Sequence, residues 1–348
     1  MDTTTLVITP EMLQLIAALD EFKGTWRTLK NIAPEQLASL KKVATIESVG
    51  SSTRIEGVTL SDKAIEALLS NLETTAFRSR DEEEVAGYAA VMEQVFEAWE
   101  AIPLTENYIK QLHALLLQHS SKDERHRGGY KTLSNSVEAF DENGQSLGVV
   151  FQTTTPFETP GKMTELVLWT RETLADKSLH PLLVIGMFIV VFLAIHPFQD
   201  GNGRLSRVLT TLLLLQSGYV YVPYSSLERV IEASKDSYYL ALRRTQGTLH
   251  ADKKPDWQPW LLFFLRALYK QMQHLEQKMT RETLLMGDLP ALSAQILELV
   301  RERGRIKTQD IETLTGESRS TIKARLSELV ECGRLKRHGQ GRSTWYGM

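Results

Sequence analysis

The chain has 348 residues, of which 42% are hydrophobic and 24% are charged, and its formal net charge is −3. This composition is typical of a folded, soluble protein and excludes a disordered or collagen-like chain, while the length favours about two domains. The one cysteine, Cys332, excludes an intrachain disulfide and a cysteine-rich zinc site.

No stretch of the sequence is typical of export or membrane insertion. The N-terminal residues lack the basic segment that opens a signal peptide. The longest apolar run, Pro181–Ile195, has 15 residues, fewer than the ~20 that a membrane-spanning helix needs. We therefore expect a cytoplasmic protein that makes no contact with a membrane.

Most of the chain repeats its apolar residues at the spacing of a helix, so we expect a mainly α-helical fold. Helix starts are marked by Ser61 and Thr105, which are good N-caps. In chain order, the helices expected in the larger part of the protein are Glu11–Phe22, Pro34–Ile46, Glu83–Trp99, Thr105–Gln118, Lys162–Leu174, Pro181–Ile195, Leu205–Gln216 and Trp257–Lys278.

One stretch departs from helical spacing. Residues that favour strands, at Ser136–Phe140 and Gly148–Thr153, flank an Asn-Gly turn at 142–144, which is a strong signal for a hairpin. Because an isolated hairpin is only marginally stable in water, we expect residues 136–154 to form a flap that packs on the helical part.

Three short helices and a second hairpin are expected after a linker at 281–290. The helices are Ser293–Arg303, Thr308–Leu314 and Arg319–Glu331, and the strands are Arg334–Arg337 and Ser343–Tyr346. This order predicts a small winged helix-turn-helix domain at 291–348.

The expected winged-helix domain is basic, whereas the rest of the chain is acidic. It carries eleven Lys and Arg against seven Asp and Glu, a balance that suits nucleic acid. Because winged helices also serve as dimerisation and protein-docking modules, DNA contact through 291–348 and protein contact are both left open. The residues expected to face phosphates are Ser318, Arg319, Ser320, Lys323, Lys336, Arg337 and Arg342.

The polar segment Ile195–Arg207, between two strongly apolar helices, has the features of an anion site. Gly201 and Gly203 permit left-handed backbone angles, so that successive amides can form a concave anion nest at the start of the next helix. Arg204 and Arg207 are three residues apart, so they lie on one side of the first helical turn and can bind phosphate oxygens. The segment therefore predicts a loop that binds a polyphosphate.

Two further side chains of this segment suggest chemistry. Asp200 offers the hard oxygen ligand that suits Mg²⁺ on phosphates, although such a residue alone is usually an ordinary turn residue. His196 is a titratable base placed just before the glycines. Phe198 is expected to be a buried plug, and His113 and His180 are expected to be hydrogen-bonded structural histidines.

The run HPFQDGNGRLSR, from His196 to Arg207, resembles the Fic-domain signature HxFx(D/E)GNGRxxR at every specified position. The resemblance extends over roughly 35–278 and implies a helical catalytic domain at 61–280. It implies transfer of AMP from ATP, with Mg²⁺, to a Ser, Thr or Tyr hydroxyl of a protein. Gly203 favours this reaction, because related Doc-type kinases carry lysine there.

The resemblance also implies roles for single residues. His196 would deprotonate the target hydroxyl, and Asp200 would hold Mg²⁺. The glycine-rich turn would cradle the phosphates, and the two arginines would clamp the β- and γ-phosphates. Tyr238 could pack on the adenine or sugar, but it is equally well explained as a core residue. The set expected at ATP is Gly201, Asn202, Gly203, Arg204, Leu205, Ser206, Arg207 and Tyr238.

A second motif, Ser52–Gly57, lies in the N-terminal helical region 1–60. It reads STRIEG and resembles the (S/T)xxxE(G/N) inhibitory pattern of self-restrained Fic proteins, with an inhibitory helix at about 51–57. Glu56 stands at a helix C-terminus, where the macrodipole disfavours a carboxylate, so a partner elsewhere is expected. The resemblance implies that Glu56 pairs with Arg207 and keeps the γ-phosphate from its productive position.

These features predict an autoinhibited protein adenylyltransferase. It would dock a protein substrate on the flap 136–154, and self-modification and a homodimer are both plausible. Two alternatives stay open. The same site could remove AMP, with Glu56 positioning a water, or the protein could be a DNA-binding regulator whose Fic-like body only senses a nucleotide.

Overall fold

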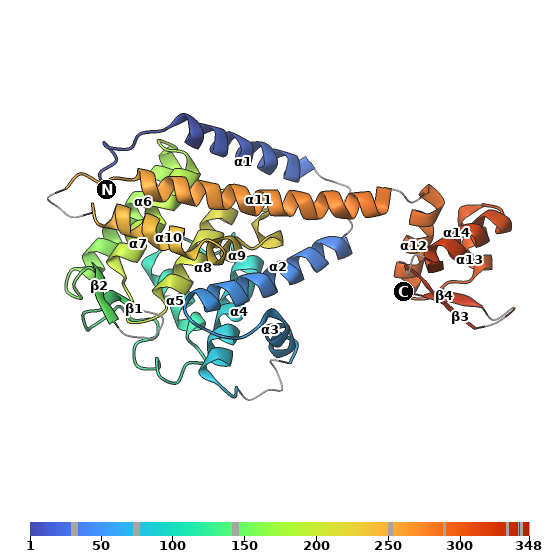
Figure 1. Ribbon diagram of the computed structural model, residues 1–348, viewed down its shortest axis with the longest axis horizontal. Helices are drawn as coiled ribbons and strands as arrows, with labels where there is room; N and C mark the ends of the chain where they lie inside the picture. The colour runs from blue at the N-terminus through green and yellow to red at the C-terminus, as the bar shows by residue number, and fades with distance from the viewer. Residues whose placement is uncertain are drawn as a thin grey trace. The chain divides into compact units, whose positions relative to one another are not determined.

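A computed structural model describes residues 1–348 apart from 29–33, 72–76, 141–145, 250–252, 288–289, 332–333, 340, 342–343 and 348. The described residues are mainly helical, as the sequence predicts (Figure 1). They divide into two compact units, Met1–Leu275 and Glu276–Met348. None of the helices in the described ranges is long and apolar enough to cross a bilayer.

The elements that build the first unit and lead out of it are α1 (Pro10–Thr28), α2 (Pro34–Ile55), α3 (Asp62–Leu69), α4 (Arg80–Ala98), α5 (Glu106–Leu116), β1 (Ser136–Phe140), β2 (Ser146–Gln152), α6 (Thr159–Asp176), α7 (Pro181–Ile195), α8 (Asn202–Gln216), the 3-10 helix η1 (Val222–Tyr224), α9 (Leu227–Glu232), α10 (Lys235–Gln246) and α11 (Gln258–Gly287).

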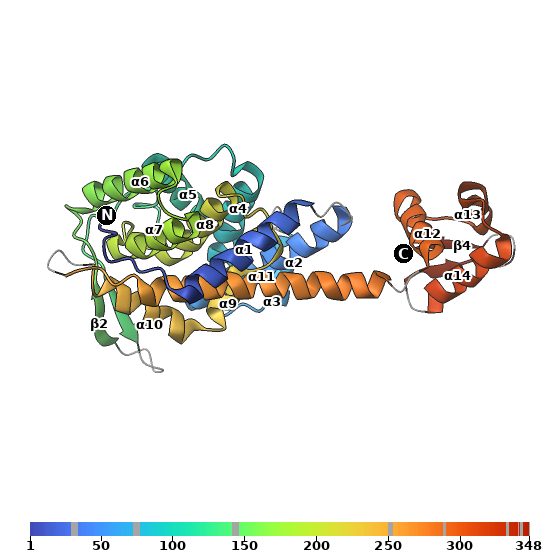
Figure 2. The same cartoon turned by 90° about the horizontal axis from the view of Figure 1, so that it is seen from above.

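Helix α7 is the centre of this unit. Nearly all its side chains are buried, as expected for a helix that is apolar on every side, and it packs against α6, α8 and α10 (Figure 2). Its first residue is Pro181, and His180 caps it by accepting a hydrogen bond from the Leu182 amide at 3.3 Å. His180 also bonds Asp20 at 2.9 Å, so it has the structural role expected from the sequence.

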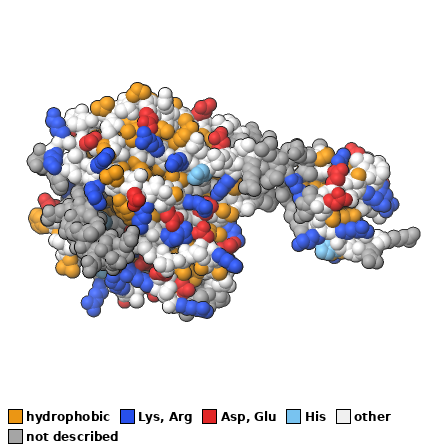
Figure 3. Space-filling model, viewed as in Figure 1, with side chains coloured by type: hydrophobic (Ala, Val, Ile, Leu, Met, Phe, Trp, Pro, Cys, Tyr) orange, Lys and Arg blue, Asp and Glu red, His pale blue; other side chains and the backbone are white. Residues whose placement is uncertain are grey.

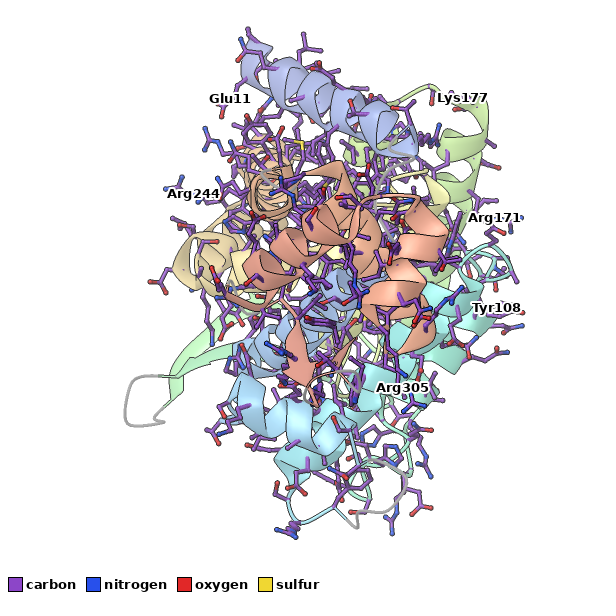
Figure 4. All side chains as sticks on the ribbon, turned by 90° about the vertical axis from the view of Figure 1, so that its right-hand side faces the viewer. Glu11, Tyr108, Arg171, Lys177, Arg244 and Arg305 are labelled. Atoms are coloured by element: carbon purple, nitrogen blue, oxygen red, sulfur yellow. The ribbon has the colours of Figure 1, made fainter. Side chains whose placement is uncertain are left out.

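Helix α1 lies alongside α11 (Figure 1). Glu11 on α1 forms an ion pair with Arg266 on α11, with 2.6 Å between Oε1 and Nε; Figure 4 labels Glu11 on its helix. The expected caps are also present, since Ser61 accepts from the Ala64 amide and Thr105 from the Tyr108 amide.

Strands β1 and β2 form the expected hairpin. They pair antiparallel, with Ser136 opposite Gln152 and Phe140 opposite Ser146. The Asn143-Gly144 turn predicted between them lies outside the described residues. Residues near β2 also contact α10, so the hairpin packs on the helical body.

Several helices are longer than the sequence predicts, and α1 extends past Phe22 to Thr28. Helix α2 continues past Ile46 to Ile55, because the small polar residues that follow Ile46 are buried in close packing instead of facing water; they include Ser51, Ser52 and Thr53. Helix α11 continues past Lys278 to Gly287. Residues 281–287 of the expected linker 281–290 are therefore helical, and they contain no helix breaker before Gly287.

The second unit contains α12 (Ala291–Arg303), α13 (Thr308–Thr315), α14 (Arg319–Glu331), β3 (Lys336–His338) and β4 (Trp345–Gly347). The strands pair antiparallel, and Ile306 forms a bridge with Tyr346. This element order is the one that the sequence predicts. The helices enclose one apolar core: Ile296, Leu297, Val300, Ile306, Ile311, Ile322, Leu326, Leu329, Leu335 and Tyr346.

Two details of the second unit bear on the sequence predictions. Trp345 is half-buried and its ring stacks on His338, with 4.1 Å between the ring centroids. It is therefore a packing residue of β4. Arg342, which we expected to contact phosphates, and Cys332 both lie outside the described residues.

Candidate active site

The polar loop His196–Gly201 joins the C-terminus of α7 to the N-terminus of α8. His196 ends α7 with φ +52°, and Gly201 precedes α8 with φ +79°. A left-handed φ is readily adopted by glycine and is uncommon for other residues, so the chain turns sharply at both ends of the loop. Gly203 does not adopt the left-handed backbone angle that the sequence suggests. Helix α8 begins at Asn202, so Gly203 is an ordinary helical residue.

Asn202 closes the loop through its side chain. Its Oδ1 accepts from the Phe198 amide at 2.9 Å, and its Nδ2 donates to the Phe198 carbonyl at 2.7 Å. Phe198 is fully buried, as predicted. The Asn202 amide group is therefore used within the protein, and only the backbone of Asn202 is left to help cradle a phosphate.

His113, on α5, holds the loop from inside the protein. Its Nδ1 accepts from the Gly128 amide at 2.8 Å, so its Nε2 carries the proton and donates to the Asp200 carbonyl at 3.0 Å. The ring stacks on Phe198 with 3.8 Å between the centroids. Burial lowers the pKa of His113 to about 4. This is the structural histidine that the sequence suggests.

Acid is expected to destabilise the protein through His113. Its pKa falls from 6.5 to about 4 on folding, so between these values the unfolded chain binds a proton that the folded chain does not. The stability is complete above about pH 6.5 and is lost as the pH falls towards 4, by about 2 kcal/mol from about pH 7 to about pH 5. In His113→Gln, which keeps a donor and an acceptor, this part of the slope should disappear. Urea unfolding at the two pH values measures it, and an unchanged slope would contradict the assignment.

His196 has a hydrogen-bond contact at one ring nitrogen, and its other ring nitrogen has none to any residue in the described ranges. Its Nδ1 lies 3.3 Å from the Leu193 carbonyl, which can only accept, so Nδ1 carries the proton and the lone pair is on Nε2. Burial lowers the pKa of His196 to about 4, helped by the nearby charge of Lys131. The side chain stays partly exposed. At neutral pH it is therefore an unprotonated imidazole that can accept a proton.

Asp200 and Arg204 belong to a network of charges that the sequence does not reveal. Arg204 is almost completely buried, and its Nη1 lies 3.0 Å from Oε2 of Glu84 on α4. Arg80, also on α4, pairs with Glu84 at 2.8 Å and with Asp200 at 3.4 Å. Although burial alone would raise it, Arg204 and the Gly201 amide hold the pKa of Asp200 below its ordinary value. The carboxylate is therefore charged.

Arg207 contacts the motif Ser52–Gly57. Its Nε donates to Ser52 Oγ at 2.8 Å, and its Nη2 donates to the Ser52 carbonyl at 2.9 Å and to Glu56 Oε1 at 2.7 Å. Its Nη1 is buried and has no hydrogen-bond partner among the residues that the structure describes. The sequence prediction that Glu56 reaches Arg207 agrees with this geometry.

Glu56 follows the last residue of α2 and lies against the start of α8. The chain turns at Gly57, where φ is +104°. A β-carbon placed on Gly203 would overlap the Glu56 carboxylate, so a larger residue at 203 could not coexist with this arrangement. The missing side chain at Gly203 thus leaves room for the Glu56 carboxylate, and this steric role replaces the left-handed turn.

Three of the residues expected at ATP have side chains that are buried inside the protein. Leu205 is fully buried in the core, and Ser206 donates to the Gly203 carbonyl at 2.7 Å. Tyr238 is buried against Tyr239 and Trp260, with centroid distances of 5.1 and 5.9 Å, and adjoins Arg207. These side chains pack within the protein around the loop, and a contribution of these three residues to ATP binding stays a prediction.

Two segments of the chain match models of known protein families. Residues 103–214 match the family model of the Fic/DOC family, and residues 288–348 match that of the transcriptional regulator DIP2311-like C-terminal domain. The chain therefore contains a Fic/DOC domain followed by a DIP2311-like regulator domain.

Two curated relatives match shorter segments. A probable protein adenylyltransferase of Aquifex aeolicus is 30% identical over 90 residues, which cover 26% of this chain and 27% of the relative. A Fido domain-containing protein of Dictyostelium discoideum is 35% identical over 74 residues, which cover 18% of this chain and 52% of the relative. The matches thus span about a quarter and about half of these relatives.

Solved structures share the fold over more of the chain. A Fic family protein from Desulfovibrio desulfuricans superposes with a TM-score of 0.65 at 23% identity, over 98% of this chain and 97% of that protein. A Fic domain-containing signalling protein from Bacteroides thetaiotaomicron gives 0.59 at 24% identity, over 73% and 94%. The mainly helical fold is therefore shared with Fic proteins.

Proposed function

We propose that this protein is a protein adenylyltransferase, which transfers AMP from ATP to a hydroxyl side chain of a protein. The observation that carries the proposal is the loop between α7 and α8, where an unprotonated imidazole of His196 stands close to buried arginines at a helix N-terminus. The Fic/DOC domain and the relative named as a probable adenylyltransferase support it.

The residues of the loop fit a nucleotide with its metal ion. Two buried guanidinium atoms, Nε of Arg204 and Nη1 of Arg207, have no hydrogen-bond partner among the described residues, and phosphate oxygens can satisfy such donors. No group of three or more metal-ligating side chains is found within the described ranges. Mg²⁺ typically binds one or two carboxylates together with substrate phosphates, and Asp200 supplies one such carboxylate. When bound, Mg²⁺ would neutralise charge on the phosphates.

The chemistry follows from the same side chains. Nε2 of His196 accepts the proton of the target hydroxyl as its oxygen bonds to the α-phosphorus, while the bond from that phosphorus to the bridging oxygen breaks and pyrophosphate leaves. Charge grows on the phosphate oxygens, and Arg204, Arg207 and the first amides of α8 are fixed donors for it. The low pKa of His196 keeps the imidazole unprotonated at neutral pH, and it also makes the imidazole a weaker base than an ordinary histidine.

Glu56 is proposed to inhibit this reaction. Its carboxylate occupies one donor of Arg207, with 2.7 Å between the atoms, and lies against Gly203. A γ-phosphate drawn to Arg207 would meet a like charge there, so ATP would bind in an unproductive position. Removal of Glu56 should permit the productive one.

The proposal is tested by intact-mass measurement of the protein after incubation with ATP and Mg²⁺. We expect little change for the wild type and the addition of one or more AMP groups for Glu56→Gly, with the protein itself as substrate. If candidate proteins from the same cell and Glu56→Gly itself all stay unmodified while the variant binds ATP, the proposed activity is wrong.

A second function, DNA binding, is favoured by the second unit. It matches a domain of transcriptional regulators, and Arg319, Ser320 and Lys323 are exposed on α14. Lys336 and Arg337 are exposed on β3, and Figure 3 shows basic side chains at the surface of this unit. Such side chains bind phosphates.

Replacing Arg319 and Lys323 together by alanine should weaken DNA binding roughly tenfold at moderate salt. Each lost phosphate contact should also reduce the slope of log affinity against log salt by about one. Fluorescence anisotropy with labelled genomic fragments measures both, and Arg171→Ala on α6 is the control, because it removes one exposed arginine from the first unit. Equal affinities for the double variant and the wild type would exclude α14 as the contact.

Four further properties stay predictions. They are self-modification, a homodimer, a cytoplasmic location and the reverse reaction, in which Glu56 would position a water to remove AMP. Release of AMP from an adenylylated protein by the wild type, and its loss in Glu56→Gly, would favour the reverse reaction.

A further inference from the structure

A buried lysine joins the hairpin to the polar loop. Lys131 lies between α5 and β1, and only 3% of its surface is exposed. Its Nζ donates to Asn135 Oδ1 at 2.8 Å, to Thr153 Oγ1 at 2.9 Å and to the Ile195 carbonyl at 3.0 Å. An ammonium group has three protons, so all of its donors are used.

The acceptors of Lys131 belong to three parts of the chain. Asn135 directly precedes β1, and Thr153 directly follows β2. The two residues also bond each other, with 2.8 Å between Thr153 Oγ1 and Asn135 Oδ1. The third acceptor, Ile195, directly precedes His196. One cation therefore connects both ends of the hairpin with the residue before the proposed base.

The backbone around His196 is held by the same segment at two more points. The Lys131 amide donates to the Pro197 carbonyl at 2.8 Å, and Asn135 Nδ2 donates to the Phe198 carbonyl at 2.8 Å. Together with Ile195, carbonyls on both sides of His196 accept hydrogen bonds from residues 131 and 135. The left-handed backbone of His196 is thus fixed by contacts to the hairpin ends.

A merely structural junction would not need a charge. The three acceptors of Nζ are neutral, and burial lowers the pKa of Lys131 to about 8, which reflects a cost of keeping the ammonium group away from water. The positive charge also lowers the pKa of His196, against the opposite effect of Glu56 and Asp200. Lys131 therefore acts on His196 through both geometry and charge.

We propose that Lys131 is a positioning residue that couples a protein target, docked on the hairpin β1–β2, to the imidazole of His196. The coupling rests on the proposed function. An extended target segment would pair with a strand of the hairpin through its backbone. Because both ends of the hairpin are tied to the residues beside His196, the docked hydroxyl takes a fixed position relative to Nε2. ATP, held by α8 and its arginines, does not depend on this tie.

Substitutions in the Glu56→Gly background test the coupling. Lys131→Met keeps the length of the side chain but removes its charge and donors. Thr153→Val has nearly the same shape and removes one acceptor, so it serves if Lys131→Met does not fold. Lys131→Arg retains a charged donor. Lys162→Met is the matched control, because Lys162 on α6 is half exposed and pairs only with Glu165 among the described residues.

Two measurements are made on each variant. Amide hydrogen exchange of 136–140 and 146–152, without nucleotide, should be roughly tenfold faster in Lys131→Met and unchanged in Lys162→Met, since a lost buried hydrogen-bond junction permits local opening. AMP transfer should fall at least roughly tenfold in Lys131→Met while the Kd for ATP with Mg²⁺ changes less than roughly threefold. Lys131→Arg should recover part of the transfer.

The outcomes separate the two proposals. Unchanged hairpin exchange in both Lys131→Met and Thr153→Val would overturn the coupling, and so would a parallel loss of ATP affinity, which would mean that Lys131 merely supports the loop. If the Glu56→Gly parent itself transfers no AMP, the proposed function fails, whereas the exchange measurement still decides whether Lys131 ties the hairpin to the loop.

Discussion

Glu56→Gly is expected to transfer AMP roughly a hundredfold faster than the wild type, or more. The reason is the ion pair with Arg207, whose atoms are 2.7 Å apart and whose guanidinium is buried. Breaking a buried ion pair costs roughly 3–5 kcal/mol; because the Glu56 side chain is 33% exposed, we take the lower end, about 3 kcal/mol, as the cost that Glu56 imposes on the γ-phosphate. About 1.4 kcal/mol corresponds to a tenfold change in rate. Initial rates with labelled ATP and Mg²⁺ measure the effect.

Two controls define what the Glu56 result means. Glu56→Gln keeps the shape but loses the charge, so its rate should lie between those of the wild type and Glu56→Gly. Glu66→Gln makes the same change on α3, where Glu66 is half exposed, and should leave the rate unchanged. If Glu56→Gly has the rate of the wild type although both bind ATP, Glu56 is not inhibitory.

His196→Ala, made in the Glu56→Gly background, should lower AMP transfer by roughly a factor of a hundred to ten thousand, which is the usual contribution of a general base. ATP binding should change little, because the phosphates are proposed to bind the guanidinium groups of Arg204 and Arg207 and the first amides of α8, and the imidazole is not one of these groups. Quenched-flow transfer rates and ATP titrations measure the two effects separately.

The matched control for His196 is His274→Ala on α11, since His274 is exposed. It should behave as the Glu56→Gly parent does. Transfer that survives in His196→Ala at the parent rate would show that another group accepts the proton, and an equal loss of ATP binding would mean that His196 supports the loop instead.

The loop chemistry could be predicted because it is local in sequence. His196, Asp200 and Gly201 lie within one short turn between two apolar helices, and the residue types alone indicate where an anion would bind. The pairing of Glu56 with Arg207 joins segments that are distant in sequence. Only the resemblance of the Ser52–Gly57 motif to a known pattern predicts it. Periodicity alone would not have brought them together.

The charges around the loop could not be predicted in this way. Arg80 and Glu84 are four residues apart at the start of a helix, which is typical of an ordinary surface pair, and their contacts to Arg204 and Asp200 arise only when α4 packs against α8. Lys131 gives no signal in the sequence, because its acceptors come from the two hairpin ends and from α7.

Local patterns also misjudged how polar residues are used. The helix expected to end at Ile46 continues to Ile55, because polar residues such as Ser48 and Ser51 are buried in helix packing. The left-handed turn expected at Gly203 is absent because α8 begins one residue earlier. In both places tertiary contacts decide the conformation.

The most direct measurement is a crystal structure of Glu56→Gly with ATP and Mg²⁺. The account predicts the triphosphate at the N-terminus of α8, with Arg207 Nη1 on a phosphate oxygen, Mg²⁺ on Asp200, and the α-phosphorus on the side of His196 Nε2. A nucleotide bound elsewhere, or a loop that stays closed to phosphate once Glu56 has been removed, would contradict it.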